Sequence, residues 1–188
     1  MRYLLLCVYM LLGGSALATA PLTDLSVDTK PQSEYAHVRV AFTPGDNIAA
    51  LIIDEIREAK SDVRVHAYLF TSKAIANALI GALRRGVKVE AIADAGEYEK
   101  GNSPVLPRLV QHGAIVYLND RQKSSHNKIV LIDASQARAT VITGSYNFTR
   151  AAQSQNAENV VILSGNRDIA QRYLRNWEFH KSRSMRMK

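Results

Sequence analysis

The chain has 188 residues, a length that fits one domain and excludes two of ordinary size. Hydrophobic residues make up 47% and charged residues 22%, which is typical of a globular protein and excludes an intrinsically disordered chain. The 24 Lys and Arg against 17 Asp and Glu give a formal net charge of +7, which favours an anionic partner such as nucleic acid or anionic lipid. The single cysteine, Cys7, excludes an intramolecular disulfide and a cysteine-based zinc site.

Residues 1–20 are typical of a cleavable bacterial signal peptide. Arg2 supplies a positive charge, residues 3–12 are apolar, and Ala18-Thr19-Ala20 predicts cleavage after Ala20. The apolar run is shorter than the roughly 20 residues that span a bilayer. We therefore expect a periplasmic or secreted protein without stable membrane association after cleavage, with an uncleaved N-terminal anchor as the alternative.

The rest of the chain predicts an arm, one folded domain and a tail. Residues 21–36 are polar and predict a flexible arm, residues 37–181 predict the domain, and residues 182–188 predict a basic tail that frays. Periodicity and capping residues predict strand 37–43, a helix from the Asp46 cap to about Lys60, strand 63–70, a helix from the Ser72 cap to Gly86, strand 87–93, helix 104–112 and strand 114–118. Strands 126–133, 139–145 and 159–163 and helix 168–181 follow. This order predicts an α/β fold, in which a mixed central β-sheet is flanked by helices on both faces as an α-β-α sandwich.

Polar side chains gather at two of these strands. His126 and Lys128 are two residues apart and share a face of strand 126–133, whereas Asp133 falls on the other face. Ser145 and Asn147 share a face at the end of strand 139–145. If the two strands are neighbours, one small site holds an imidazole, an ammonium group, a hydroxyl and a carboxamide.

This set of groups suits the hydrolysis of a phosphodiester. A neutral imidazole can attack phosphorus, while Lys128, Ser145 and Asn147 can donate hydrogen bonds to the non-bridging oxygens. Glu158 can accept a hydrogen bond from the second ring nitrogen of a histidine and fix its tautomer. The chemistry requires no metal or other cofactor, and the other four histidines lack the close spacing of metal ligands. We expect one of these, His66, to be a packed strand histidine; the alternative is that it lines the cleft, beside Tyr68 near the end of its strand.

The pattern His126-x-Lys128-x4-Asp133, followed by Gly144-Ser145-x-Asn147 and Glu158-Asn159, resembles the HKD signature of the phospholipase D superfamily. Over about residues 37–180 the chain also resembles its small bacterial endonuclease branch, which has one motif per chain. The resemblance implies a phospholipase D-like catalytic domain and a metal-independent phosphodiesterase that works through a covalent phosphohistidine. It implies catalytic roles for His126 as nucleophile or acid, Lys128, Asp133 and Glu158, and phosphate binding by Lys128, Ser145 and Asn147. The strand parity of Asp133 suggests that it supports the site without touching phosphate.

A single motif creates a mechanistic problem, because the attacking histidine must start neutral while the leaving oxygen needs a proton donor. One ring cannot easily do both on opposite sides of phosphorus. We therefore expect a homodimer in which two copies of His126 share one active site; the resemblance implies the same.

The predicted function is a non-specific endonuclease whose substrate is nucleic acid, DNA in the first place and RNA as a second candidate. Arg121 and Lys123 near His126 favour a polyanion, and no sequence-reading module is recognised. One alternative is a lipid phosphodiesterase, such as a cardiolipin hydrolase, anchored by its N-terminus. A second alternative is a non-catalytic nucleic-acid-binding protein. The absence of a Gly-x-Ser-x-Gly elbow argues against a serine nucleophile at Ser145.

Overall fold

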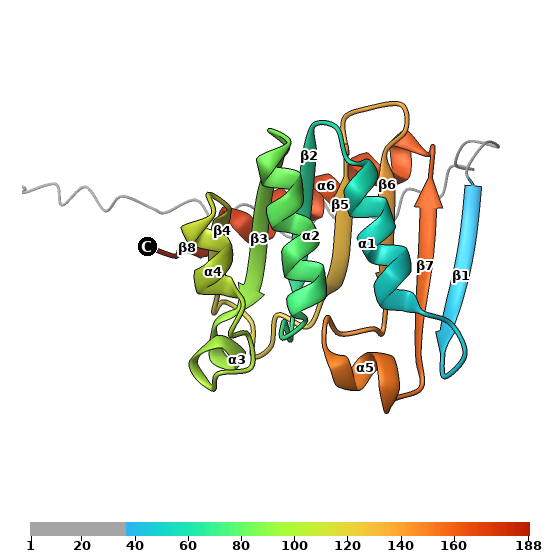
Figure 1. The fold of residues 1–188 in the computed structure, drawn as a ribbon. Helices are drawn as coiled ribbons and strands as arrows, with labels where there is room; N and C mark the ends of the chain where they lie inside the picture. Colours follow the sequence, from blue (N-terminus) through green and yellow to red (C-terminus); the bar gives the residue numbers. More distant parts are fainter. Residues whose placement is uncertain (1–36) are drawn as a thin grey trace, which may run out of the picture.

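The computed structural model describes residues 37–188, so the predicted signal peptide and arm lie outside the described residues (Figure 1). Its elements in chain order are β1 His37–Thr43, α1 Ile48–Glu58, β2 Asp62–Ala67, α2 Lys73–Arg84, β3 Lys88–Asp94, α3 Ala95–Glu99, α4 Leu106–Gln111, β4 Ile115–Asn119, β5 Lys128–Ile132, β6 Thr140–Gly144, α5 Arg150–Ser154, β7 Glu158–Ser164, α6 Arg167–Lys181 and β8 Met185–Arg186.

The eight described strands form one mixed sheet in the order β1-β7-β6-β5-β2-β3-β4-β8. β2, β3 and β4 pair in parallel, and every other neighbouring pair is antiparallel. The parallel part comes from the first half of the domain, where helices separate the strands and provide the crossovers that parallel pairing needs. The prediction of a mixed sheet is therefore confirmed, and β5 and β6 are neighbours.

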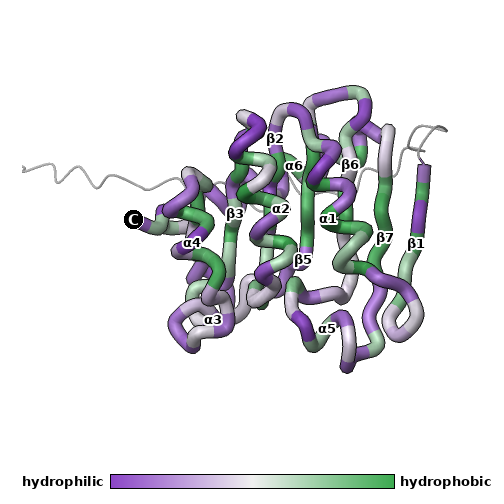
Figure 2. Tube along the Cα trace, in the orientation of Figure 1, coloured by the Kyte–Doolittle hydropathy of each residue, from purple (hydrophilic) through white to green (hydrophobic). Residues whose placement is uncertain are grey.

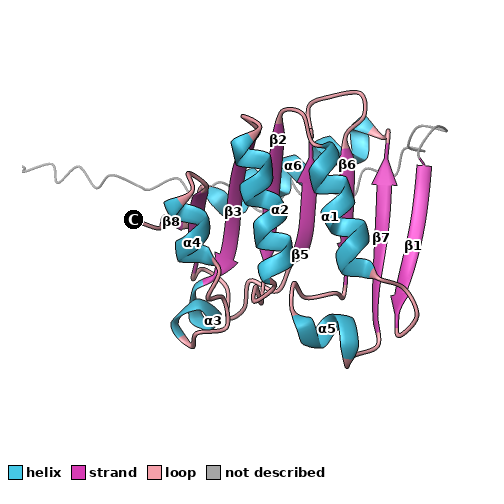
Figure 3. Ribbon diagram, in the orientation of Figure 1, coloured by secondary structure: helices cyan, strands magenta, loops and turns pink. Residues whose placement is uncertain are grey.

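Helices cover both faces of the sheet, as predicted (Figures 1 and 3). α1, α2 and α4 lie on one face, and the long α6 crosses the other. Alternation along β2 serves both layers: Val63, Val65 and Ala67 pack in the core under α1 and α2, while Arg64 and His66 point to the α6 face. Figure 2 shows hydrophobic stretches along the central strands and a mixture of hydrophobic and hydrophilic residues along α1 and α2. No helix within residues 37–188 is long and apolar enough to cross a bilayer.

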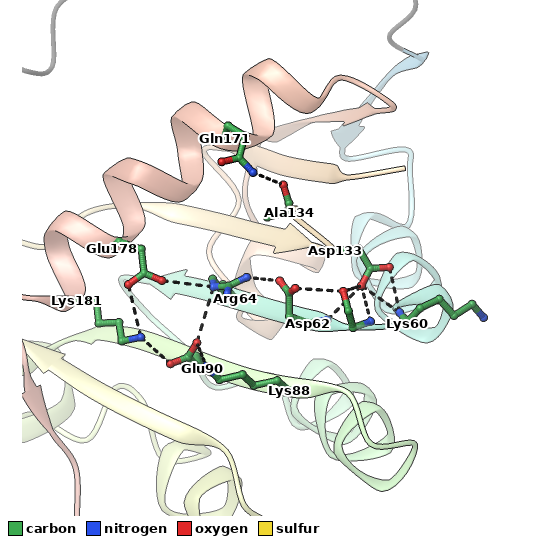
Figure 4. Close-up of polar contacts among 11 residues, drawn as sticks. Lys60, Asp62, Arg64, Lys88, Glu90, Asp133, Ala134, Gln171, Glu178 and Lys181 are labelled. Atoms are coloured by element: carbon green, nitrogen blue, oxygen red, sulfur yellow. Dashed lines mark hydrogen bonds and ion pairs between the residues drawn. The ribbon is translucent and has the colours of Figure 1, made fainter. Parts of the chain in front are cut away.

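α6 is docked by polar contacts as well as by Trp177, which is buried and donates a hydrogen bond from Nε1 to the carbonyl of Val65 at 3.0 Å. Arg64 lies within ion-pair distance of Glu90 and Glu178, and Lys181 Nζ is 2.9 Å from Glu90 Oε1 (Figure 4). The end of α6 is therefore tied to β2 and β3 by charge. Gln171 Nε2 donates to the carbonyl of Ala134 after β5 at 2.9 Å, so the helix is also held to the second half of the chain (Figure 4).

The structure corrects several element boundaries. Asn47, not Asp46, caps α1 by accepting from Ala50 N, because the Asp46 carboxylate instead accepts from Phe42 N in the preceding turn. β2 ends at Ala67, three residues before the predicted end. The short α3 and α5 are absent from the prediction, since five-residue helices have too little periodicity to detect. The prediction that the tail frays is wrong, because Met185–Arg186 form β8, which pairs with β4.

Candidate functional site

The predicted site residues other than Asp133 lie at the end of the sheet where β5 begins and where α3 and α5 are found (Figure 1). His126 precedes β5 in a loop, so the predicted strand starts two residues too early. Its side chain is exposed, and its ring lies 4.4 Å from the ring of Tyr68, centroid to centroid. The backbone of His126 is held, because its carbonyl accepts a hydrogen bond from Lys128 Nζ at 2.8 Å. The ring is thus supported on one side and open to a substrate on the other.

Lys128 is the first residue of β5 and is buried, although it carries an ammonium group. Its Nζ lies 4.9 Å from the centroid of the Tyr68 ring, a distance at which the ring face attracts a cation. Burial lowers the pKa of Lys128 to about 8, and the Glu158 carboxylate acts in the opposite direction. The side chain therefore keeps its charge at neutral pH but holds it in a poorly solvated place, where a phosphate oxygen would be a strong partner.

Ser145 and Glu158 form a direct pair between the end of β6 and the start of β7. Ser145 Oγ donates to Glu158 Oε2 at 2.5 Å and accepts from Asn159 N at 3.1 Å. The two strands meet closely here because residue 144 is glycine: an added Cβ would lie 2.1 Å from the carbonyl oxygen of Asn159. Gly144 thus explains why a Gly-Ser pair stands at the end of this strand.

Asn147 lies between two side chains that are anchored in the core. Tyr146 and Phe148 are both buried, and Phe148 packs against Phe70 with ring centroids 5.5 Å apart. Asn147 Oδ1 is buried and has no hydrogen-bond partner among the described residues. The unpaired Oδ1 is an acceptor, which a phosphate oxygen cannot complete, whereas Nδ2 of the same amide is a donor that can bind a phosphate oxygen. This position fits a side chain that binds a phosphate oxygen.

Asp133 lies at the opposite end of β5 from Lys128 and is buried (Figure 4). Its carboxylate accepts from the backbone N–H groups of Lys60, Ser61 and Asp62 at 2.7–3.1 Å and from Ser61 Oγ at 2.8 Å. Burial alone raises the pKa of Asp133, but these hydrogen bonds outweigh it and hold the pKa below its ordinary value. Asp133 therefore supports the loop before β2, as its strand parity suggested, and lies at the end of β5 away from His126 and Lys128.

The structure brings Lys128, Ser145 and Glu158 to one end of the three adjacent strands β5, β6 and β7, and it places His126 beside them in the loop that enters β5. Within the described residues the Glu158 carboxylate accepts hydrogen bonds from Ser145 and Asn156 and none from a histidine, so the predicted orienting contact is not seen within this subunit. The sequence analysis did not assign Tyr68 to the site. Tyr68 is the first residue after β2, and an aromatic residue just beyond the end of a strand gives only a weak sequence signal for a role in a site.

The family model described as "Cardiolipin synthase, PLD-like domain" matches residues 52–180. A protein named phospholipase D from Rickettsia bellii is 31% identical over 183 residues, which cover 92% of this chain and 88% of that protein. A mitochondrial cardiolipin hydrolase from Chlamydomonas reinhardtii is 24% identical over 79% of this chain and 62% of its own length.

The crystal structure of Nuc from Salmonella typhimurium, a phospholipase D family member, superposes with a TM-score of 0.76 at 28% identity and covers 82% of this chain and 99% of that chain. The family match covers β2 through α6, which includes every predicted site residue. The chain belongs to the phospholipase D superfamily of phosphodiesterases.

Proposed function

We propose that this protein is a metal-independent endonuclease that hydrolyses DNA, with RNA as a second substrate. The observation that carries the proposal is the exposed imidazole of His126, which stands beside the buried ammonium group of Lys128 in a loop with two exposed cations, Arg121 and Lys123. The first pair suits attack on a phosphodiester. The exposed cations suit a polyanion, whose phosphates they attract without reading its sequence.

In the proposed mechanism a neutral His126 attacks phosphorus and forms a P–N bond, while the P–O bond to the leaving group breaks. Lys128 and Asn147 donate hydrogen bonds to the non-bridging oxygens as negative charge develops there, and Ser145 joins them once its hydroxyl hydrogen turns from Glu158 to the phosphate. The leaving oxygen takes a proton from the protonated His126 of a second copy. That second ring, now neutral, removes a proton from water while the water oxygen attacks phosphorus; a P–O bond forms, the P–N bond breaks, and both histidines return to their starting states.

The second copy is part of the proposal because the chain offers one His126 and the mechanism needs two. β1 provides an apolar surface for association: Val38, Val40 and Phe42 lie on one face of this edge strand and are 55–58% exposed. Phe42 pairs with Asn159, the residue after Glu158, so the row of apolar side chains ends beside the site's end of the sheet. A homodimer across this face would bury the row and bring two sites together.

The test is the degradation of plasmid DNA by the purified protein in the presence of EDTA. We expect activity to persist with the chelator and to disappear in His126→Asn, while the control His112→Asn, which changes an exposed histidine outside the site, stays active. Acid-labile radiolabel on His126 after a quench would identify the covalent intermediate. Complete loss of activity on chelation, or a folded and fully active His126→Asn, would overturn the proposal.

A lipid phosphodiesterase is the second candidate, favoured by the relatives named phospholipase D and cardiolipin hydrolase. The exposed row on β1 would then contact a bilayer instead of a second copy. A side-by-side assay on DNA and on cardiolipin liposomes separates the candidates. Cleavage of lipid alone selects this one, and stoichiometric binding of DNA with neither product selects a non-catalytic binding protein.

We also propose that the protein is exported to the periplasm or secreted after cleavage behind Ala20. The support is the pattern of residues 1–20 in the sequence. N-terminal sequencing of the protein from its native cells should begin at Pro21. A mature chain that begins at Met1 would instead support the anchored alternative.

A further inference from the structure

A second histidine, His66, contacts both residues that flank His126. His66 is fully buried on β2, and its Nε2 lies 2.7 Å from Ser125 Oγ. Its Nδ1 lies 3.5 Å from Nδ2 of Asn127, at the outer limit of a hydrogen bond. His66 is therefore the packed strand histidine that its sequence position predicted, but what it packs against is the loop that carries the exposed ring.

Two further hydrogen bonds hold the same loop. The backbone N–H of Ser125 donates to Asp94 Oδ2 at 2.6 Å, and Lys128 Nζ donates to the carbonyl of His126 at 2.8 Å. Asp94 is itself fixed at the end of β3, where its other oxygen caps α3. The chain is thus held on both sides of His126, although residues 120–127 belong to no helix or strand.

The hydrogen bonds assign one protonation state to His66. In this arrangement the Asn127 amide nitrogen donates to Nδ1, and Nε2 carries the hydrogen that faces Ser125 Oγ. Burial, with a smaller effect of His180, lowers the pKa of His66 to about 3 and keeps the ring neutral. His180 on α6 faces His66 edge-on at 5.1 Å between centroids, and Asp94 faces it through Ser125.

We propose that His66 is a positioning residue for the phosphodiesterase reaction. Its ring contacts Ser125 and Asn127 and so holds the ring of His126 in a fixed position beside Tyr68; we call this pair of contacts the clasp. This inference rests on the proposed role of His126. The physical reason is that a nucleophile in an irregular loop must be held within a fraction of an ångström of its reactive position. A buried imidazole with two different hydrogen-bonding nitrogens can fix two neighbours of that nucleophile at once.

The test compares His66→Leu, His66→Gln and Ser125→Ala with the wild-type protein on a small phosphodiester such as bis(p-nitrophenyl) phosphate. We expect His66→Leu to lower kcat by about 100-fold with KM within about twofold, since displacement of the ring affects reaction more than binding. Glutamine keeps an N–H near the position of Nε2, so His66→Gln should recover part of this loss. His180→Leu is the matched control, because it removes a ring from the same cluster without touching the loop.

Hydrogen–deuterium exchange gives a readout that needs no activity. We expect residues 121–127 to exchange faster in His66→Leu and Ser125→Ala, and peptides from β2, β3 and β5 to exchange as in the wild type. If His126→Asn stays active, the proposed function fails, yet faster loop exchange in His66→Leu still supports the clasp. Unchanged loop exchange, or an effect on KM alone, would overturn the clasp while leaving the proposed function in place.

Discussion

The buried imidazole of His66 makes folding stability depend on pH, and a single substitution removes this dependence. In the folded chain burial and the nearby His180 lower the pKa of His66 from 6.5 to about 3. Below pH 6.5 the unfolded chain binds a proton at this side chain and the folded chain does not, so stability is full above pH 6.5 and is lost as the pH falls toward about 3. At about 1.4 kcal/mol per pH unit, the loss two units below 6.5 is about 3 kcal/mol.

Urea denaturation followed by circular dichroism at pH 7 and pH 4.5 measures this loss. Leucine cannot titrate, so His66→Leu should lose about 3 kcal/mol less than the wild type between the two pH values. The variant also loses hydrogen bonds and is expected to be less stable at pH 7, so the difference between pH values is the quantity to compare. His112→Gln, an exposed histidine, serves as the control. Equal losses in the wild type and His66→Leu would refute a neutral, buried imidazole.

Three other predictions concern the two ends of the sheet. Gly144→Ala should destabilise the fold by about 1–3 kcal/mol in thermal unfolding and impair activity, because the added Cβ would lie 2.1 Å from the Asn159 carbonyl oxygen. The control is Gly81→Ala in α2, whose added Cβ would meet only a side chain at 3.8 Å and should be tolerated. Since the pKa of Lys128 is about 8, KM for a phosphodiester should rise as the pH passes that value, and Lys128→Arg, which stays charged, should show no such rise in a pH series of initial rates. Asp133→Asn should lower the free energy of unfolding by about 2–4 kcal/mol while kcat stays within about twofold.

The architecture could be predicted because strong local patterns coincide with the long-range pairing. Helices between the early strands require parallel crossovers, and the alternation along β2 requires two covered faces. The missed elements depend on contacts that no local pattern records. β8, for example, exists because Met187 N reaches the carbonyl of Val116 and Met185 pairs with Leu118, residues almost 70 positions away in the sequence.

The site could be predicted only in part, for a related reason. His126, Lys128, Ser145 and Asn147 have a spacing that predicts shared chemistry, and the pairing of β5 with β6 places the ends of their strands together. The role of His66 depends on the distance between β2 and a loop about 60 residues later. The residues around His66 predict a packed strand histidine, which the structure confirms. They carry no information about the contact with Ser125, which depends on the fold.

The position of Asp133 explains how a residue outside the chemistry can belong to the same motif as Lys128. Asp133 anchors the loop that leads into β2, and β2 then pairs with β5 from Val63–Ile132 to Ala67–Lys128. Asp133 thus fixes the start of β2. His66 lies near the other end of β2 and contacts the loop of His126, and Tyr68, just after the strand, contacts the His126 ring. Five paired positions keep this register once the sheet has formed, so the loss of the Asp133 carboxylate should appear in the free energy of unfolding before it appears in kcat.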